Sequence, residues 1–198
     1  MKKLAIILMT LTLTLGLAIT VAQSIALPPF TNPFTEEESL ERAVTNYMME
    51  TDFGFTAEEG GVLIPTPIIL KTEVNADETE ATVYGNFWIF TYTLDGKIMK
   101  TGACGENPGV MKLKKNDGKW NVTSLELAEE GESFQSSIKK IAHGDAELEA
   151  DYYHSSGAGE DSFLPQFQRA AVLNYVKMNN LDVEAYQDYG ADPVSIID

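Results

Sequence analysis

Two carboxylates and a histidine stand at helical spacing in the last third of the chain. Glu147, Asp151 and His154 occupy positions i, i+4 and i+7. These positions share one face of a continuous α-helix, because the helix repeats every 3.6 residues. Two carboxylates and an imidazole form a ligand set that divalent transition metals accept. The alternative is a solvated acidic helix face, which we favour because such faces commonly show this spacing.

The cysteine of the chain, Cys104, suits either a nucleophile or a small core residue. A catalytic thiol needs a neighbouring base that removes its proton. The chain has two histidines, His143 and His154, and the spacing ties neither to the cysteine. We therefore predict a buried, inert cysteine in a strand, and a single cysteine excludes an intramolecular disulfide. For His143 we predict a helix C-terminus, where an imidazole interacts favourably with the helix dipole.

Alternating aromatic residues give the strongest strand prediction, over residues 81–94. One face of this strand carries four aromatic side chains, Tyr84, Trp88, Phe90 and Tyr92. The opposite face is also apolar, with Val83, Phe87 and Ile89. A strand that is apolar on both faces is buried on both faces. The four aromatic residues are candidates for the wall of a ligand pocket, and the alternative is a core beneath the helices that follow.

Net charge argues against several classes of function. The chain carries 14 Lys and Arg residues against 30 Asp and Glu, a formal net charge of −16. Clustered cations bind nucleic acids and anionic membrane surfaces, so this balance argues against both kinds of partner. The sequence also lacks a nucleophile elbow, a His-Glu-x-x-His motif, a phosphate loop and a dinucleotide fingerprint. We therefore predict no cofactor and assign no catalytic residue.

The charge is unevenly distributed along the chain. Residues 144–198 are strongly acidic, whereas residues 95–119 are rich in lysine. The lysines of this second segment are Lys97, Lys100, Lys112, Lys114, Lys115 and Lys119. In one interpretation they form an anion-binding strip. In the interpretation that we favour, they protect a sheet edge from further pairing or face the acidic tail of the same molecule.

Residues 1–26 resemble a bacterial secretory signal peptide. Lys2 and Lys3 precede an apolar stretch over residues 4–22, and small residues follow up to Ala26. We predict export to the periplasm, the cell surface or the medium. An uncleaved anchor is the alternative, since a stretch of this length just spans a bilayer. No later segment is as long and apolar, so we expect no membrane span after cleavage.

Proline-rich residues 27–34 predict a tether between the signal peptide and one α+β domain at residues 35–198. Within this domain, residues 35–127 predict a helix and a sheet, and residues 128–198 predict a helical extension. The expected fold class is α+β, with an N-terminal helix packed on a curved antiparallel sheet of about five strands. The domain is long enough to form a hydrophobic core without disulfides.

Local signals mark the individual elements of this domain. A capping box at Thr35 and Glu38 predicts the start of a helix that ends near residue 50. An Asp95-Gly96 turn predicts a hairpin, and a parity change near Thr123 predicts a β-bulge. The expected strands are residues 62–74, 81–94, 97–104, 110–115 and 119–127. Helices are expected at residues 133–142, 145–153 and 164–178, with a last helical turn at 185–189.

The last predicted hairpin turns through the segment Asp117-Gly118-Lys119-Trp120-Asn121-Val122. With one helix before the sheet, this segment resembles the closing hairpin of NTF2-like (cystatin-like) α+β domains, over residues 35–127. The resemblance implies a sheet concavity that holds a small apolar ligand. It implies no fixed chemistry, because such folds host many functions. The chain departs from the family in having a single early helix and a long helical tail.

Three functions are compatible with these features. We expect a non-enzymatic exported domain that binds a small apolar molecule or a cell-envelope component in the sheet concavity. The alternative is an extracytoplasmic interaction domain that presents an acidic helical face to a protein or polymer. A small hydrolase or isomerase is the third, and it requires His143 or His154 to point into a cavity near a carboxylate. The sequence leaves the oligomeric state open.

Overall fold

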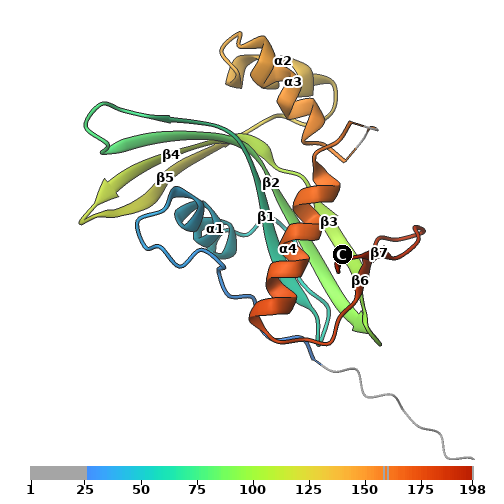
Figure 1. Cartoon of the computed structure of the whole chain (residues 1–198). Helices are drawn as coiled ribbons and strands as arrows, with labels where there is room; N and C mark the ends of the chain where they lie inside the picture. Colours follow the sequence, from blue (N-terminus) through green and yellow to red (C-terminus); the bar gives the residue numbers. More distant parts are fainter. Residues whose placement is uncertain (1–25, 158, 160, 198) are drawn as a thin grey trace, which may run out of the picture.

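Strand β2 (Glu80–Asp95) lies at the centre of the sheet and has neighbours along both of its edges. β1 (Val62–Val74) pairs antiparallel with one edge over most of its length. The other edge pairs with β4 (Pro108–Asn116) and then with β3 (Ile98–Gly105), both antiparallel. β5 (Lys119–Leu127) adds to the outer edge of β4, and Figure 1 shows this hairpin extending beside α1.

The structure is a computed structural model that describes residues 26–157, 159 and 161–197. The predicted signal peptide, residues 1–26, lies outside the described residues except for Ala26. The described chain is α+β, as predicted, with four α-helices and a seven-stranded sheet. The remaining elements are α1 (Leu40–Glu50), the 3₁₀ turn η1 (Gly131–Ser133), α2 (Phe134–Ile141), α3 (Ala146–His154), α4 (Leu164–Met178), β6 (Ala185–Gln187) and β7 (Val194–Ser195).

Helices cover both faces of the sheet, which accounts for the two apolar faces of β2. α1 packs on the face that carries Phe87 and Ile89. α4 packs on the opposite face, over Trp88 and Phe90. α2 and α3 cover the other end of that same face, around Tyr84. Figure 1 shows α1 and α4 on opposite sides of β1 and β2. The predicted burial of β2 on both faces is confirmed.

Two glycines lie opposite each other near the point where the edge of β2 stops pairing with β4 and begins to pair with β3. Gly85 of β2 and Gly109 of β4 are direct cross-strand partners. A Cβ at Gly85 would lie 2.6 Å from the Ile68 carbonyl oxygen, and one at Gly109 would lie 2.4 Å from that of Glu126. These distances exclude a side chain, so both positions require glycine for the backbones to approach this closely.

The sheet contains more strands than the predicted number of about five. Residues 185–189, expected as a helical turn, instead begin with β6, which pairs parallel with β3 and antiparallel with β7. The sheet is therefore mixed, and the prediction of a purely antiparallel sheet was wrong. A three-residue strand is too short to show a hydrophobic period. Its pairing also depends on β3, which lies far away in the sequence.

α1 begins later than predicted. Ser39 is its N-cap, and the Ser39 Oγ accepts a hydrogen bond of 3.1 Å from the backbone N–H of Arg42. The predicted capping box of Thr35 and Glu38 was wrong, because both residues precede the helix. Glu38 instead forms an ion pair of 3.7 Å with Lys115 at the β4–β5 hairpin. The start of α1 is thus fixed by one serine and by a contact with the sheet.

Candidate functional site

The four aromatic candidates fill the core of the sheet. Trp88, Phe90 and Tyr92 stack in succession, with ring centroids 5.5 Å and 6.1 Å apart. They lie in the cluster beneath α4, whereas Tyr84 lies in the cluster formed with α2 and α3. Trp88 is the most exposed of the four, at 7%. The structure therefore places them in the core, and their contact with a ligand stays a prediction.

The polar atoms of this aromatic core have partners. Trp88 Nε1 donates a hydrogen bond of 2.9 Å to the Ser155 carbonyl oxygen. The Tyr92 hydroxyl accepts a hydrogen bond of 3.2 Å from Gln168 Nε2. Burial raises the pKa of Tyr92 far above its ordinary value, so the phenol stays protonated. Packed rings and paired polar atoms together mark a structural core.

The metal-ligand candidates lie on α3 at the surface. Glu147 and His154 are exposed, and Asp151 is half-buried. Within residues 26–157, 159 and 161–197, no three His, Cys, Asp or Glu side chains lie close enough together to hold a metal ion. His154 instead packs edge-on against Phe163, with ring centroids 5.5 Å apart. His143 is also exposed, so both histidines lie at the surface, and a hydrolase or isomerase function stays a prediction.

Cys104 lies in β3, as predicted, but its side chain is exposed rather than buried. β6 pairs with Ile98, Met99 and Lys100 at the start of β3, and the paired stretch ends before the cysteine. Surrounding protein atoms, followed by the Asp188 carboxylate, raise the pKa of the Cys104 thiol. The thiol form therefore dominates at neutral pH, which opposes a role as a nucleophile.

Five of the six lysines of residues 95–119 form ion pairs with carboxylates of the same molecule, and Lys112 is the exception among the described pairs. Lys97 Nζ lies 3.1 Å from Asp182 and 2.6 Å from Glu184, both in the acidic tail. The other pairs are Lys100 with Asp95, Lys114 with Glu80, Lys115 with Glu38 and Lys119 with Glu37. Internal pairing leaves little of the predicted anion-binding strip available. The interpretation in which the lysines face the tail is confirmed for Lys97.

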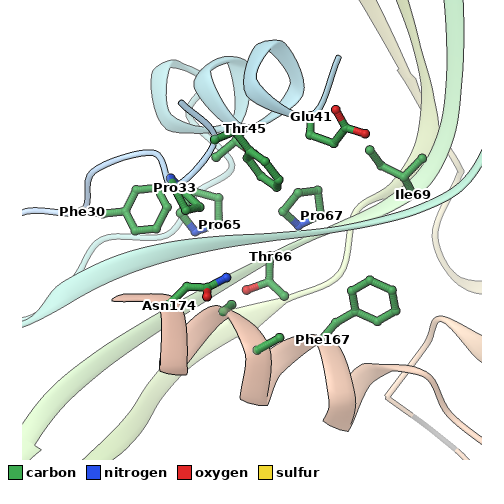
Figure 2. A pocket seen from close by; sticks show the side chains of 13 residues that line it. Phe30, Pro33, Glu41, Thr45, Pro65, Thr66, Pro67, Ile69, Phe167 and Asn174 are labelled. Carbon is green, nitrogen blue, oxygen red and sulfur yellow. The ribbon is translucent and has the colours of Figure 1, made fainter. Parts of the chain in front are cut away.

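A groove crosses the edge of the sheet at β1, between α1 on one face and α4 on the other (Figure 2). Among the described strands, β1 pairs with β2 alone, so its outer edge borders the groove. The groove has a volume of about 420 Å³, within the range of small-molecule sites. Its lining consists of Phe30, Pro33, Phe34, Glu41, Thr45, Pro65, Thr66, Pro67, Ile69, Phe167, Ala170, Ala171 and Asn174.

Two prolines of β1 form the floor of the groove. Pro65 lies opposite Ile89 of β2, and Pro67 lies opposite Phe87. Proline has no N–H, so the hydrogen bonds of this pairing come from the residues between, and the two proline nitrogens face the outer edge. Figure 2 shows both rings on the α1 side of β1 and the Thr66 side chain on the α4 side. This part of the edge therefore lacks two of the donors that a further strand would use.

Residues 27–34, expected as a tether, pack between α4 and α1 and close one end of the groove. The Tyr175 hydroxyl of α4 donates a hydrogen bond of 2.6 Å to the Pro28 carbonyl oxygen, and burial raises the pKa of Tyr175 to about 12. Asn32 Nδ2 donates to the Arg42 carbonyl oxygen of α1 at 3.1 Å. These bonds hold the segment that supplies Phe30 to the groove lining.

Two buried hydroxyls in the groove lining lack partners. Thr45 and Thr66 are 1% and 3% exposed. Among the residues that the structure describes, their Oγ1 atoms are the buried side-chain polar atoms without a hydrogen-bond partner. They come from different elements, Thr45 from α1 and Thr66 from β1. A buried hydroxyl without a partner costs about 1–3 kcal/mol, and each such atom calls for an explanation such as a bound water or ion.

Sequence reasoning found one part of this groove. The expected strand at residues 62–74 is confirmed as β1, which borders the groove. The groove itself was missed because its lining comes from the tether, α1, β1 and α4, which are separated in the sequence. The hydrogen bond between Tyr175 and Pro28 joins residues that are 147 positions apart, so no local sequence pattern predicts it.

Comparison of the chain with family models, with curated proteins and with solved structures gave no match. The resemblance to NTF2-like domains therefore stays a prediction. Along the described part of the chain, the structure has no helix that is both long and apolar enough to cross a membrane.

Proposed function

We propose that this chain is an exported binding domain that holds a small molecule in the groove between α1 and α4. The ligand has an apolar body, because phenylalanine, proline and alanine supply most of the lining. It also carries a hydrogen-bonding group, because the lining contains hydroxyl, amide and carboxylate side chains. The proposal keeps the ligand class expected from the sequence and moves the site from the sheet concavity to its edge.

The observation that carries this proposal is the position of the unpartnered hydroxyls. The other buried side-chain polar atoms of the described residues have partners, as for Trp88 with Ser155. Thr45 and Thr66 lack them, and both line the same groove from different elements. A ligand or an ordered water that enters the groove and reorients these side chains supplies the missing hydrogen bonds.

The chemistry of the edge favours a small molecule over an extended peptide. A peptide that adds a strand to a sheet binds through main-chain hydrogen bonds to the edge. Pro65 and Pro67 remove two donors from the middle of this edge. Side-chain contacts in the groove therefore remain the main source of binding free energy.

A substitution that fills the groove tests the proposal. Ala170 is exposed on α4 and lines the groove, so Ala170→Trp occupies the space while the core stays intact. Ala150→Trp, at an exposed position on α3, is the matched control. A library of small amphiphilic molecules is screened against the wild type by ligand-observed NMR.

We expect compounds that bind the wild type and Ala150→Trp to lose at least about 90% of their affinity for Ala170→Trp, a difference of about 1.4 kcal/mol. Unfolding midpoints of both variants show that each is folded. Hits that bind Ala170→Trp as well as the wild type would refute the groove as the site. A screen without any hit would refute it as well.

A further inference from the structure

The groove has one charged side chain in its lining, and that charge is negative. Glu41 lies at the rim, exposed on the first turn of α1. Within the described residues, Glu41 has no ion pair. Its neighbours Glu37 and Glu38 differ, because they pair with Lys119 and Lys115. Glu41 therefore keeps its charge available to a ligand.

The cation next to Glu41 in the sequence is bound to a backbone carbonyl oxygen at the end of the groove. Arg42 follows Glu41 in α1, and its guanidinium donates a hydrogen bond of 2.5 Å to the Phe34 carbonyl oxygen. A small recess adjoins the groove at this end, and Glu36 lines it together with Glu41. The rim thus presents two carboxylates, on a chain whose net charge is −16. The negative electrostatic potential of these groups attracts a cationic ligand and repels an anionic one.

The other lining groups suit the same kind of ligand. Phe30, Phe34 and Phe167 supply aromatic rings, and a cation within about 6 Å of a ring centroid is attracted by its π-face. The hydroxyls of Thr45 and Thr66 can accept hydrogen bonds. An ammonium group carries only donors, so it complements such acceptors.

We infer that the groove selects organic ammonium compounds, in which a protonated amine is attached to an apolar body. The amine lies toward the carboxylate of Glu41, and the apolar body lies along the prolines and phenylalanines of the groove. This inference rests on the proposed binding function and adds the charge of the ligand to it.

Three probes of one shape test the charge preference, namely 2-phenylethylamine, 2-phenylethanol and phenylacetate. Their dissociation constants are measured at neutral pH and low salt by ligand-observed NMR. We expect the amine to bind most tightly and phenylacetate most weakly. Added salt weakens the binding of the amine and leaves that of the alcohol unchanged, because exposed charges are screened.

The substitution Glu41→Gln tests whether the carboxylate of this residue causes the preference for the amine. We expect it to weaken amine binding about two- to fivefold, the range for an exposed ion pair, and to leave the alcohol unaffected. Glu147→Gln, which makes the same charge change on α3, leaves both unaffected. An unchanged amine affinity in Glu41→Gln, or phenylacetate binding as tightly as the amine, overturns the inference.

The same probes separate this inference from the proposed function. If Ala170→Trp abolishes binding of the alcohol and the amine shows no preference, the binding site stands and the ammonium inference falls. If Ala170→Trp changes the binding of none of the three probes, the groove is not their site and both proposals fall.

Discussion

The aromatic core beneath α4 and the groove share strand β1, but their polar atoms differ. In the core, the Trp88 indole donates to Ser155 and the Tyr92 hydroxyl accepts from Gln168. In the groove, the hydroxyls of Thr45 and Thr66 are buried without partners. The comparison teaches that a run of aromatic residues marks where the chain packs on itself. Under the proposed function, unpartnered buried hydroxyls mark where a ligand supplies the missing hydrogen bonds.

The largest expected effect lies in the core. Trp88→Ala removes a ring that is 7% exposed and its hydrogen bond to Ser155, so we expect a loss of about 3–5 kcal/mol in unfolding free energy. Phe34→Ala, at the groove rim and 37% exposed, serves as the comparison and costs less than half as much. Denaturant titration measures both. Equal losses would contradict the division of the molecule into a core and a binding groove.

The next effect concerns the wall of the groove. Tyr175→Phe removes the hydrogen bond to the Pro28 carbonyl oxygen, and we expect a loss of about 0.5–1.5 kcal/mol at neutral pH. Faster amide hydrogen exchange in residues 27–34 would show that this segment has loosened. If exchange there stays as slow as in the wild type, Tyr175 does not hold the segment.

Ionisation of the Tyr175 phenol makes the unfolding free energy depend on pH in the alkaline range. Burial raises the pKa of Tyr175 to about 12, whereas an unfolded tyrosine titrates near pH 10. Its contribution to stability is thus fully present below about pH 10 and is lost as pH rises toward 12. Unfolding free energy should fall less steeply over this range in Tyr175→Phe than in the wild type. Equal slopes would show that another group causes the alkaline loss.

The smallest effect gives the sharpest contrast, because one substitution is made at two equally buried threonines. Thr91 and Thr66 are both 3% exposed. The Thr91 hydroxyl donates to the Ala103 carbonyl oxygen at 2.9 Å, so Thr91→Val should cost about 1 kcal/mol. The Thr66 hydroxyl has no partner, so Thr66→Val should leave unfolding free energy unchanged or raise it by up to about 1 kcal/mol. A loss at Thr66 equal to that at Thr91 would remove the contrast.

The sequence predicted those parts of the fold whose signals are local. The bounds of β1, β5 and α4 agree with the structure, since turns and periodic apolar residues mark them. The parity change near Thr123 also agrees, because the pairing of β4 with β5 shifts at that residue. β6 was missed because its pairing depends on a distant strand. The start of α1 was misplaced because the sequence offers two capping residues, Thr35 and Ser39, and the helix uses Ser39.

The site was harder to predict than the fold. A run of aromatic residues has the same pattern whether a ligand or a helix covers it, and here α4 lies over Trp88 and Phe90. The groove is recognised instead by the buried hydroxyls that lack a hydrogen-bond partner, and only three-dimensional contacts show which hydroxyls these are. The sequence around Thr45, Thr66 and Thr91 does not show which hydroxyl has a partner, yet one has a partner and two do not.

A crystal structure of the protein grown with 2-phenylethylamine tests the central claim most directly. We expect the ring of the probe between α1 and α4, over Pro65 and Pro67. We expect its amine to be directed toward Glu41, with a new hydrogen bond at Thr45 or Thr66. An empty groove in crystals where the probe occupies another surface would contradict the account.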